Sequence, residues 1–333
     1  MKHILLICGL LAAFVAEAQE FTQEEYAKAK GGDPTAQYNI GMCYHYGAGG
    51  ETNQVEAFFW FRCAAEQGNA DAQYKLGETF FTGKDFVDQN YPTAASWFIK
   101  AAHQGHAKAQ YAVGVCCECG YGITQDDSLA YAYYSKAAAN DEELAEAWTR
   151  SGNLLFLGKV GGGNDEDKEK GRSYIRKGAV YGDPEAQYFV SQDYDAATRN
   201  VFKIRYWLRK ASQGGNEKAL AELKAIEQEA DAQGMNLTQQ VVSTYDEYEP
   251  IDSIPGMLKV KLFDYYGIID LSSREVLPCK YNKIRYKEGT IHCQLDDATD
   301  IYTADGKFIK QTDNEDEDGT DGLDGLSLYF LLN

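Results

Sequence analysis

One tripeptide recurs along this chain at a period of about 37 residues. Ala-Gln-Tyr begins at Ala36, Ala72, Ala109 and Ala186, and a weaker copy begins at Ala147. The gaps between successive alanines are 36, 37, 38 and 39 residues. A fixed period of this length is typical of a stacked repeat array, in which each unit buries its apolar face only against its neighbours. Arrays of this kind usually hold partners rather than perform chemistry.

Each unit has the pattern of two helices. In the first unit Ala36, Ile40 and Tyr44 are spaced by four residues, so they share one helical face. Gly41 follows the aliphatic residue and recurs as Gly77 and Gly114. A glycine inside a helix costs about 1 kcal/mol relative to alanine. Its recurrence predicts that a second helix passes too close for a side chain.

The second helix of each unit carries an aromatic residue, a pair of small residues and a closing glycine. In the first unit these are Trp60, Ala64-Ala65 and Gly68. A glycine at this place ends a helix in the left-handed conformation. The sequence therefore predicts a mainly α protein. We expect an α/α superhelical solenoid of about five helix pairs over residues 32–230, including a terminal capping helix, and then a small β-rich C-terminal module.

The combined pattern resembles the Sel-one-like repeat, a relative of the tetratricopeptide repeat. It reads A-x-x-x-L-G, then a G-x-G turn, then W-x-x-K-A-A-x-x-G, and it covers residues 32–225. The resemblance implies an α/α superhelix with a concave groove for protein–protein contact, often in an adaptor or scaffold. Two units depart from the pattern. The fourth has Trp148-Thr149 in place of Gln-Tyr. The fifth has Ser191 in place of glycine, and its turn around Tyr194 to Asn200 is expected to be short and irregular.

The N-terminus has the form of a processing signal. Lys2 precedes an apolar run from Ile4 to Val15, and small residues flank Glu17. We therefore expect residues 1–18 to be a signal peptide and the protein to be exported, periplasmic or secreted in a bacterium. No integral membrane segment is expected after cleavage. Residues 19–31 are expected to form a starting half-repeat helix.

Strand-like alternation begins after a predicted linker at residues 231–250. Residues 251–310 resemble a WG-type β-repeat, because Tyr266-Gly267-Ile268-Ile269-Asp270 stands where that family has W-G-x-I-D. The resemblance implies a β-module with no established chemistry. Residues 311–333 form an acidic tail, for which a solvated segment is a better interpretation than a calcium loop.

The charge and the cysteines narrow the functional classes. The net charge of −19 argues against nucleic acid and anionic membrane surfaces as partners. Because an exported chain can form disulfides, two pairings are possible: Cys43 with Cys63 and Cys279 with Cys293. The cluster of Cys116, Cys117 and Cys119 falls in a predicted repeat helix, where cysteine packs as a small hydrophobic residue.

No pattern in the chain indicates an enzyme. A nucleophile with its base, a metal set and a cofactor motif are all missing from the sequence, so we expect no catalytic residue, no metal and no cofactor. His103 and His106 are three residues apart at a helix end, which would place them on one face. Cations that interact with the helix dipole are the commoner reason for such histidines.

A partner-binding surface is predicted from the side of the first helices opposite the buried face. Offsets of two, six and nine from the repeat alanine hold aromatic, Met, His and acidic side chains that suit an extended peptide or a partner helix. The candidate residues are Tyr38, Met42, His45, Tyr74, Glu78, Phe81, Tyr111, Glu118 and Tyr188. The alternative is that these tyrosines pack one repeat against the next.

Three functions remain open at this stage. The first is an exported, non-enzymatic scaffold or adaptor that binds a protein or peptide partner through the array. The second is an inhibitor or regulator of a secreted or envelope enzyme. The third is an envelope carbohydrate- or peptidoglycan-binding protein, which requires a contiguous strip of exposed aromatic rings.

Overall fold

The computed structural model describes residues 23–48, 50–84, 86–198, 201–232, 244–251, 254, 257–270, 275–287, 289–295 and 298–313. Two compact units are present, one helical and one built of strands. The predicted signal peptide and most of the acidic tail lie outside the described residues. No helix of the described part is long and apolar enough to cross a membrane.

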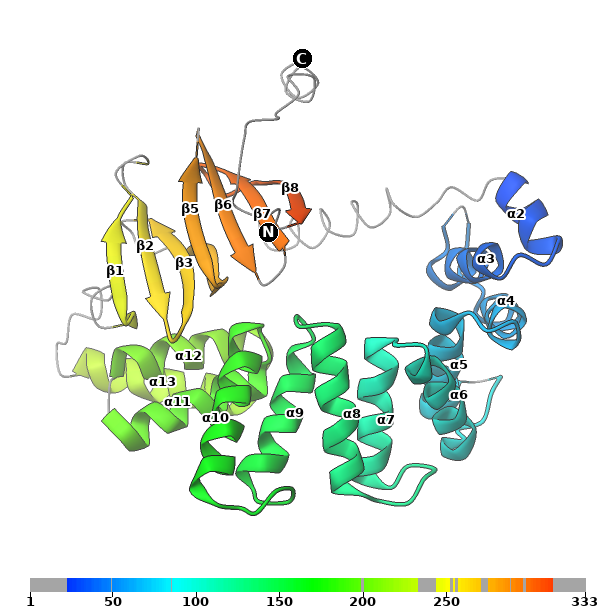
Figure 1. The fold of residues 1–333 in the computed structure, drawn as a ribbon, viewed down its shortest axis with the longest axis horizontal. Coiled ribbons are helices and arrows are strands. Elements are labelled where there is room, and N and C mark those ends of the chain that lie inside the picture. The colour runs from blue at the N-terminus through cyan, green and yellow to red at the C-terminus, as the bar shows by residue number, and fades with distance from the viewer. Residues whose placement is uncertain are drawn as a thin grey trace. The chain divides into compact units, whose positions relative to one another are not determined.

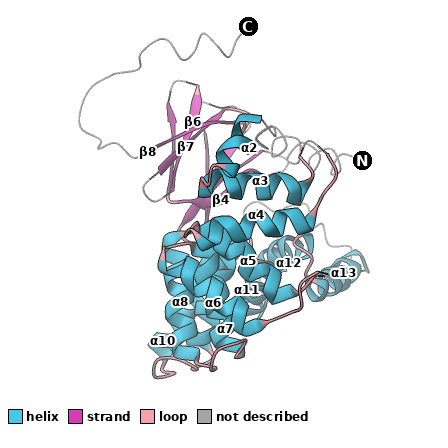
Figure 2. Cartoon of the chain, turned by 90° about the vertical axis from the view of Figure 1, so that its right-hand side faces the viewer, coloured by secondary structure: helices cyan, strands magenta, loops and turns pink. Residues whose placement is uncertain are grey.

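Twelve helices in the described residues form the array, and each packs against the next along the chain (Figures 1 and 2). They are α2 (Gln23–Lys30), α3 (Pro34–Tyr46), α4 (Gln54–Glu66), α5 (Ala70–Thr82), α6 (Tyr91–His103), α7 (Ala107–Cys119), α8 (Asp127–Asn140), α9 (Ala145–Phe156), α10 (Asp165–Val180), α11 (Pro184–Thr198), α12 (Val201–Gln213) and α13 (Glu217–Ala232). The predicted solenoid of about five helix pairs, α3/α4 to α11/α12, is confirmed.

The first helix of each of the first three pairs begins at a side-chain cap. Asp33 and Asn69 accept hydrogen bonds of 2.8 Å from the backbone N–H groups of Ala36 and Ala72. The repeat alanine is therefore the third helical residue, and it is also almost fully buried against the preceding helix pair. Capping of this kind stabilises a helix by about 1 kcal/mol. These caps explain why the first helices start at the same place in successive repeats.

The recurring glycines make room for an aromatic ring. A Cβ on Gly41 would lie 2.6 Å from ring carbons of Phe61, and one on Gly77 would overlap the ring of Phe98. Gly114 meets Tyr134 in the same way. The expected close approach of the second helix is confirmed. The ring belongs to the residue after the one that the sequence pattern emphasised, since Phe61 rather than Trp60 covers the glycine.

The glutamine of each tripeptide is buried and bridges three helices. The side-chain amide of Gln73 in α5 donates to the carbonyl of Ala65 in α4 at 3.1 Å and accepts from Gln104, at the end of α6, at 2.8 Å. Gln37 and Gln110 make the corresponding pairs of bonds to the neighbouring helices. Each of these glutamines thus links one helix pair to the one before it.

The fourth pair uses a different contact in place of this bridge. Trp148 replaces the glutamine, and its indole N–H donates to the carbonyl of Glu142 at 3.0 Å. Gly152 of α9 and Gly171 of α10 face each other so closely that a Cβ on either would lie 2.7 Å from opposing backbone. The departure seen in the sequence is therefore a locally tighter helix pair.

The fifth pair corrects one expectation. Instead of an irregular turn around Tyr194 to Asn200, α11 continues to Thr198. Residues 193–198 contain no glycine or proline, and loss of the repeat glycine at Ser191 does not shorten the helix. Residues 199 and 200 lie outside the described part.

Two small antiparallel sheets follow the helices in the chain, which confirms the predicted β-rich C-terminal module. The first sheet joins its strands in the order β1 (Glu247–Pro250), β2 (Met257–Leu262), β3 (Tyr265–Asp270) and β4 (Glu275–Tyr281). The second joins β5 (Lys283–Lys287), β6 (Thr290–Leu295), β7 (Ala298–Thr303) and β8 (Phe308–Asp313). Ile268, Tyr281 and Ile291 belong to one buried cluster that includes residues of both sheets. The WG-type resemblance falls on β3 and β4 and stays a prediction.

Substitution of Gly77 by alanine tests the glycine–aromatic contact. Phe98 is only 3% exposed and its ring has nowhere to move, so overlap with the new Cβ outweighs the roughly 1 kcal/mol that alanine contributes to helix formation. We expect a net loss of about 1–3 kcal/mol in the free energy of unfolding. Urea denaturation followed by far-ultraviolet circular dichroism measures it.

The matched control for Gly77→Ala is Ser96→Ala on the exposed side of α6, which is expected to change stability by less than about 0.5 kcal/mol. A Gly77→Ala protein as stable as the unaltered chain would show that the ring does not hold the helices at this distance.

Candidate functional site

A hollow of about 250 Å³ lies at the first junction of the array, where α3 and α4 meet α5. Its apolar part is formed by Ala57, Phe58 and Phe61 of α4 together with Phe86 from the loop after α5. Its polar part is formed by His45, Gln54, Lys75, Glu78, Thr79, Thr82 and Lys84. An apolar floor with a few convergent polar groups is typical of a binding site.

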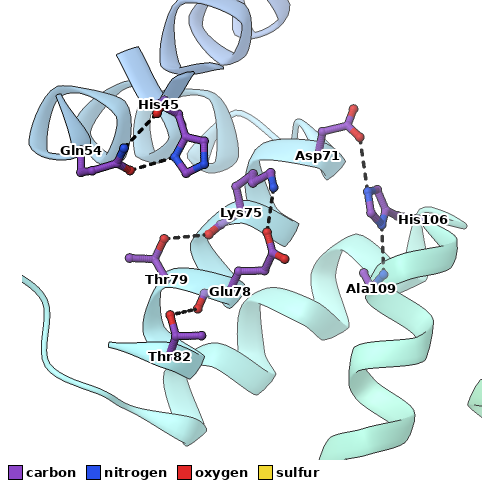
Figure 3. Close-up of polar contacts among 9 residues, drawn as sticks. All are labelled: His45, Gln54, Asp71, Lys75, Glu78, Thr79, Thr82, His106 and Ala109. Atoms are coloured by element: carbon purple, nitrogen blue, oxygen red, sulfur yellow. Dashed lines mark hydrogen bonds and ion pairs between the residues drawn. The ribbon is translucent and has the colours of Figure 1, made fainter. Parts of the chain in front are cut away.

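The polar side chains are held by local hydrogen bonds (Figure 3). The ring Nδ1 of His45 and the amide oxygen of Gln54 are 2.8 Å apart, and the Gln54 amide also donates to the carbonyl of His45 at 2.9 Å. Lys75 donates to the Glu78 carboxylate at 2.9 Å. The hydroxyl groups of Thr79 and Thr82 donate to carbonyls one turn earlier in α5.

One lip of the hollow is a short hydrogen-bonded turn. Lys84 and Val87 exchange two backbone hydrogen bonds of 2.8 and 2.9 Å. This turn places the ring of Phe86 5.8 Å from the ring of Phe58. The side chain of Lys84 is exposed and has no ion-pair partner within the described part of the chain.

Two of the nine predicted partner-binding residues line the hollow, and the other seven do not. All nine are half-buried, and His45 and Glu78 line the hollow. Phe81 belongs to the second junction, where α5 and α6 meet α7, and Glu118 belongs to the third, where α7 and α8 meet α9. The remaining five are Tyr38, Met42, Tyr74, Tyr111 and Tyr188.

The repeat tyrosines pack against aromatic rings of their own helix pair, and one of them, Tyr74, also packs against the start of the next pair. The ring of Tyr38 lies 5.8 Å from Phe61, and that of Tyr111 lies 5.4 Å from Tyr134. Tyr74 stacks on His106 at 4.8 Å. Burial, with a smaller contribution from Asp71, raises the pKa of Tyr38 to about 12. Such packed rings do not form the exposed strip that carbohydrate binding requires.

Neighbouring junctions fill the place of the hollow in other ways. At the second junction the ring of Tyr121 stacks on Tyr91 at 4.7 Å and meets Phe81 edge-on at 5.5 Å. At the third junction Glu118 accepts a 2.7 Å hydrogen bond from Tyr134 and lies 3.3 Å from Arg150. These differences between junctions were not predicted from the sequence, because the repeat pattern compares positions along one helix and not side chains that meet from three helices.

The seven cysteines of the described residues are free thiols, so neither suggested disulfide is formed in this structure. Cys43 and Cys63 each lie near the C-terminal end of their helix. Because α3 and α4 are antiparallel, these two ends point away from each other. Cys279 and Cys293 lie on β4 and β6, which belong to different sheets. Both positions are packed into the protein interior.

The two neighbouring histidines lie on opposite sides of a turn rather than on one helical face. His103 is the last residue of α6, whereas His106 is the N-terminal cap of α7. The Nδ1 of His106 accepts from the backbone N–H of Ala109 at 3.0 Å, and its Nε2 is 3.3 Å from Asp71 (Figure 3). The contact with His106 lowers the pKa of Asp71. His106 therefore caps the third repeat as Asp33 and Asn69 cap the first two.

Within the described residues, no group of three or more His, Cys, Asp or Glu side chains is placed to hold a metal ion. The cluster of Cys116, Cys117 and Cys119 is part of α7. Cys116 and Cys117 are fully buried, and burial raises the pKa of Cys116 to about 12. Cys119 points to solvent.

Comparison with known proteins agrees with this repeat geometry. The model of the Sel1 repeat matches residues 34–69, 70–106, 107–142 and 184–216, so the array contains Sel1 repeats. The unmatched stretch includes the fourth pair, in which Trp148 replaces the bridging glutamine. Sel1 repeats generally mediate contacts between proteins, and their fold is typically a non-enzymatic scaffold.

Several solved structures are similar to the array. A Sel1 repeat protein from Oxalobacter formigenes is 29% identical with a TM-score of 0.52, and the match covers 59% of this chain and 78% of that one. A protective antigen of uropathogenic Escherichia coli with an SLR fold, c5321, is 27% identical with a TM-score of 0.38, and the match covers 61% of this chain and 50% of that one. No curated protein matches the chain.

Thiol reactivity distinguishes packed cysteines from a reactive cluster. Labelling by iodoacetamide at pH 8 requires a thiolate, which burial suppresses at Cys116, Cys117 and Cys293. We expect Cys119 to be labelled at least tenfold faster than these three in the folded protein, and all to react alike in urea. Peptide mass spectrometry gives the rates. Equal labelling of Cys116 and Cys119 in the folded state would contradict the packing of α7.

Proposed function

We propose that this protein is an exported, non-enzymatic scaffold or adaptor that binds a protein partner through its helical array. The observation that carries the proposal is the hollow at the first junction, because it combines three phenylalanine rings with polar groups on a rigid set of helices. Binding interfaces commonly use such pockets for buried anchor side chains. The association of Sel1 repeats with protein–protein contacts supports the same assignment.

Export is supported by the sequence of residues 1–18, and the proposed location is the periplasm or the outside of a bacterium. The strongly negative charge disfavours nucleic acid and anionic lipid as partners. Inhibition or regulation of an enzyme is a special case of partner binding, and it would appear as loss of that enzyme's activity when the two proteins are mixed.

The binding surface is found by photo-cross-linking from single positions in the full chain. A photoreactive phenylalanine analogue replaces Met42, which has in α3 the position that Glu78 has in α5. Control positions are Phe59, 45% exposed on α4, and Phe308, 59% exposed on β8. The bait is expressed in the source organism and the cross-linked products are identified by mass spectrometry.

We expect one partner to be cross-linked in a stoichiometric product from position 42 and at least tenfold less from positions 59 and 308. Cross-linking from Phe308 alone would assign binding to the strands and contradict an array-based adaptor. No stoichiometric product from any of the three positions would contradict the adaptor function itself.

A further inference from the structure

The hollow occupies a place that the array fills with its own side chains one repeat later. Three positions in each junction determine which side chains occupy this space. They are the ninth residue after the repeat alanine, the first residue of the second helix of the same pair, and the residue after the glycine that ends the first helix of the following pair. At the second junction these positions are Phe81, Tyr91 and Tyr121. Their ring centroids lie 4.7–5.5 Å apart, so they form one aromatic cluster.

The same three positions at the first junction are His45, Gln54 and Lys84. His45 and Gln54 hydrogen-bond to each other, so the His45 imidazole is held against Gln54, and no tyrosine ring stands where Tyr91 stands at the second junction. Lys84 extends into solvent from the place that Tyr121 has in the next repeat. The hollow is therefore the volume that three rings occupy at the second junction, reduced by Phe58, whose counterpart there is Ala95.

The third junction shows that polar residues at these positions do not leave a hollow by necessity. There the three positions are Glu118, Asp127 and Lys159, and Lys159 lies 4.0 Å from Asp127. Arg150 reaches across to Glu118, whereas its counterpart at the first junction, Lys75, pairs with Glu78 of its own helix. The first junction differs from the second and the third, because its polar groups pair locally and phenylalanine rings line a hollow beside them.

We propose that this hollow binds a tyrosine side chain of the partner protein, with an acidic residue next to that tyrosine in the partner's sequence. The inference rests on the proposed adaptor function and identifies the chemistry of the partner's anchor. The ring of the tyrosine would contact Phe58, Phe61 and Phe86 as Tyr121 contacts its neighbours at the second junction. A cavity of ~150 Å³ is enough for a benzene ring, so the volume is sufficient.

Two polar features select this anchor over an aliphatic one. The carboxylate of Glu78 lines the hollow and would accept a hydrogen bond from the phenol, as Glu118 accepts one from Tyr134 at the third junction. Lys84 is an exposed lining residue of the hollow, so its ammonium group could meet the neighbouring carboxylate of the partner. A buried aromatic anchor surrounded by a polar rim is the usual arrangement of a hot spot in a protein–protein interface.

The test uses defined dipeptides on the full chain, followed by two-dimensional ¹H–¹⁵N NMR. The probes are acetyl-Asp-Tyr-amide, acetyl-Asp-Leu-amide and acetyl-Lys-Tyr-amide. We expect acetyl-Asp-Tyr-amide to bind in the millimolar range and at least fivefold more tightly than the other two, with shifts confined to residues around the hollow. Equal affinity for the leucine probe, or shifts elsewhere in the chain, would overturn the proposal.

A filled hollow provides the decisive variant. The triple substitution His45→Phe, Gln54→Tyr, Lys84→Tyr introduces the side chains of the second junction into the space that Phe58 leaves, and the Tm of the variant is measured first to establish that it folds. Binding of acetyl-Asp-Tyr-amide is expected to fall at least tenfold. Lys84→Tyr alone alters only an exposed residue, and it provides the same test if the triple variant does not fold. Unchanged binding in a folded variant would refute the site.

The same variants separate this inference from the adaptor function. If the partner that cross-links from position 42 binds the filled variant as well as the unaltered chain, the adaptor function stands and the tyrosine anchor is wrong. If the dipeptide binds in the hollow but no partner is cross-linked, the site is correct and the adaptor function is wrong.

Discussion

A buried glutamine amide is the interaction on which the array depends. In each of the first three helix pairs it donates to a carbonyl at the end of the preceding pair and accepts from a side chain at the end of its own second helix. An unpaired amide at such a depth would cost about 1–3 kcal/mol, so the hydrogen bonds fix how one pair stacks on the next. In the first three pairs, glycine–aromatic contacts set the spacing between the two helices, and side-chain caps set where the first helix begins.

This frame leaves a small set of positions free to vary. The three junctions described above are each formed by one helix pair and the first helix of the next, yet one contains an aromatic cluster, one an ion-pair network and one a hollow. At the first junction His45 hydrogen-bonds to Gln54, and Lys75 pairs with Glu78 of its own helix, so neither pair fills the hollow. The first junction therefore contains the most site-like feature of the array, and the proposed function and the tyrosine anchor both follow from it.

The sequence predicted the repeat frame well because its constraints recur. Gly41, Gly77 and Gly114 identified the close helix approach, since only a steric requirement explains a glycine at the same place in a helix each time. The glutamine recurs in the same tripeptide, but its bridging role could not be predicted, because its hydrogen-bond partners lie on two other helices. The choice of Phe61 over Trp60 as the ring that covers Gly41 was also inaccessible, because the two are adjacent in an aromatic run and differ only in direction.

The site was predictable only in part. His45 and Glu78 were among the nine candidates, but Phe58 and Lys84 come from the second helix and from a loop, which the pattern of the first helices does not include. Comparison of equivalent positions across helix pairs, rather than along one helix, contains the missing signal. The pairing of Cys43 with Cys63 is not formed in the structure, because each lies near the C-terminal end of its helix and the two helices are antiparallel.

The most direct test of this account compares Gln73→Met with Gln187→Met, which keep side-chain length but remove the amide. Gln73 makes bonds through both its nitrogen and its oxygen, whereas the oxygen of Gln187 has no partner within the described residues. Urea unfolding is predicted to show a loss of about 1–3 kcal/mol for Gln73→Met and roughly half of that for Gln187→Met. Losses below about 0.5 kcal/mol for both, a size typical of ordinary surface substitutions, would contradict the claim that the glutamine bridge holds the repeats together.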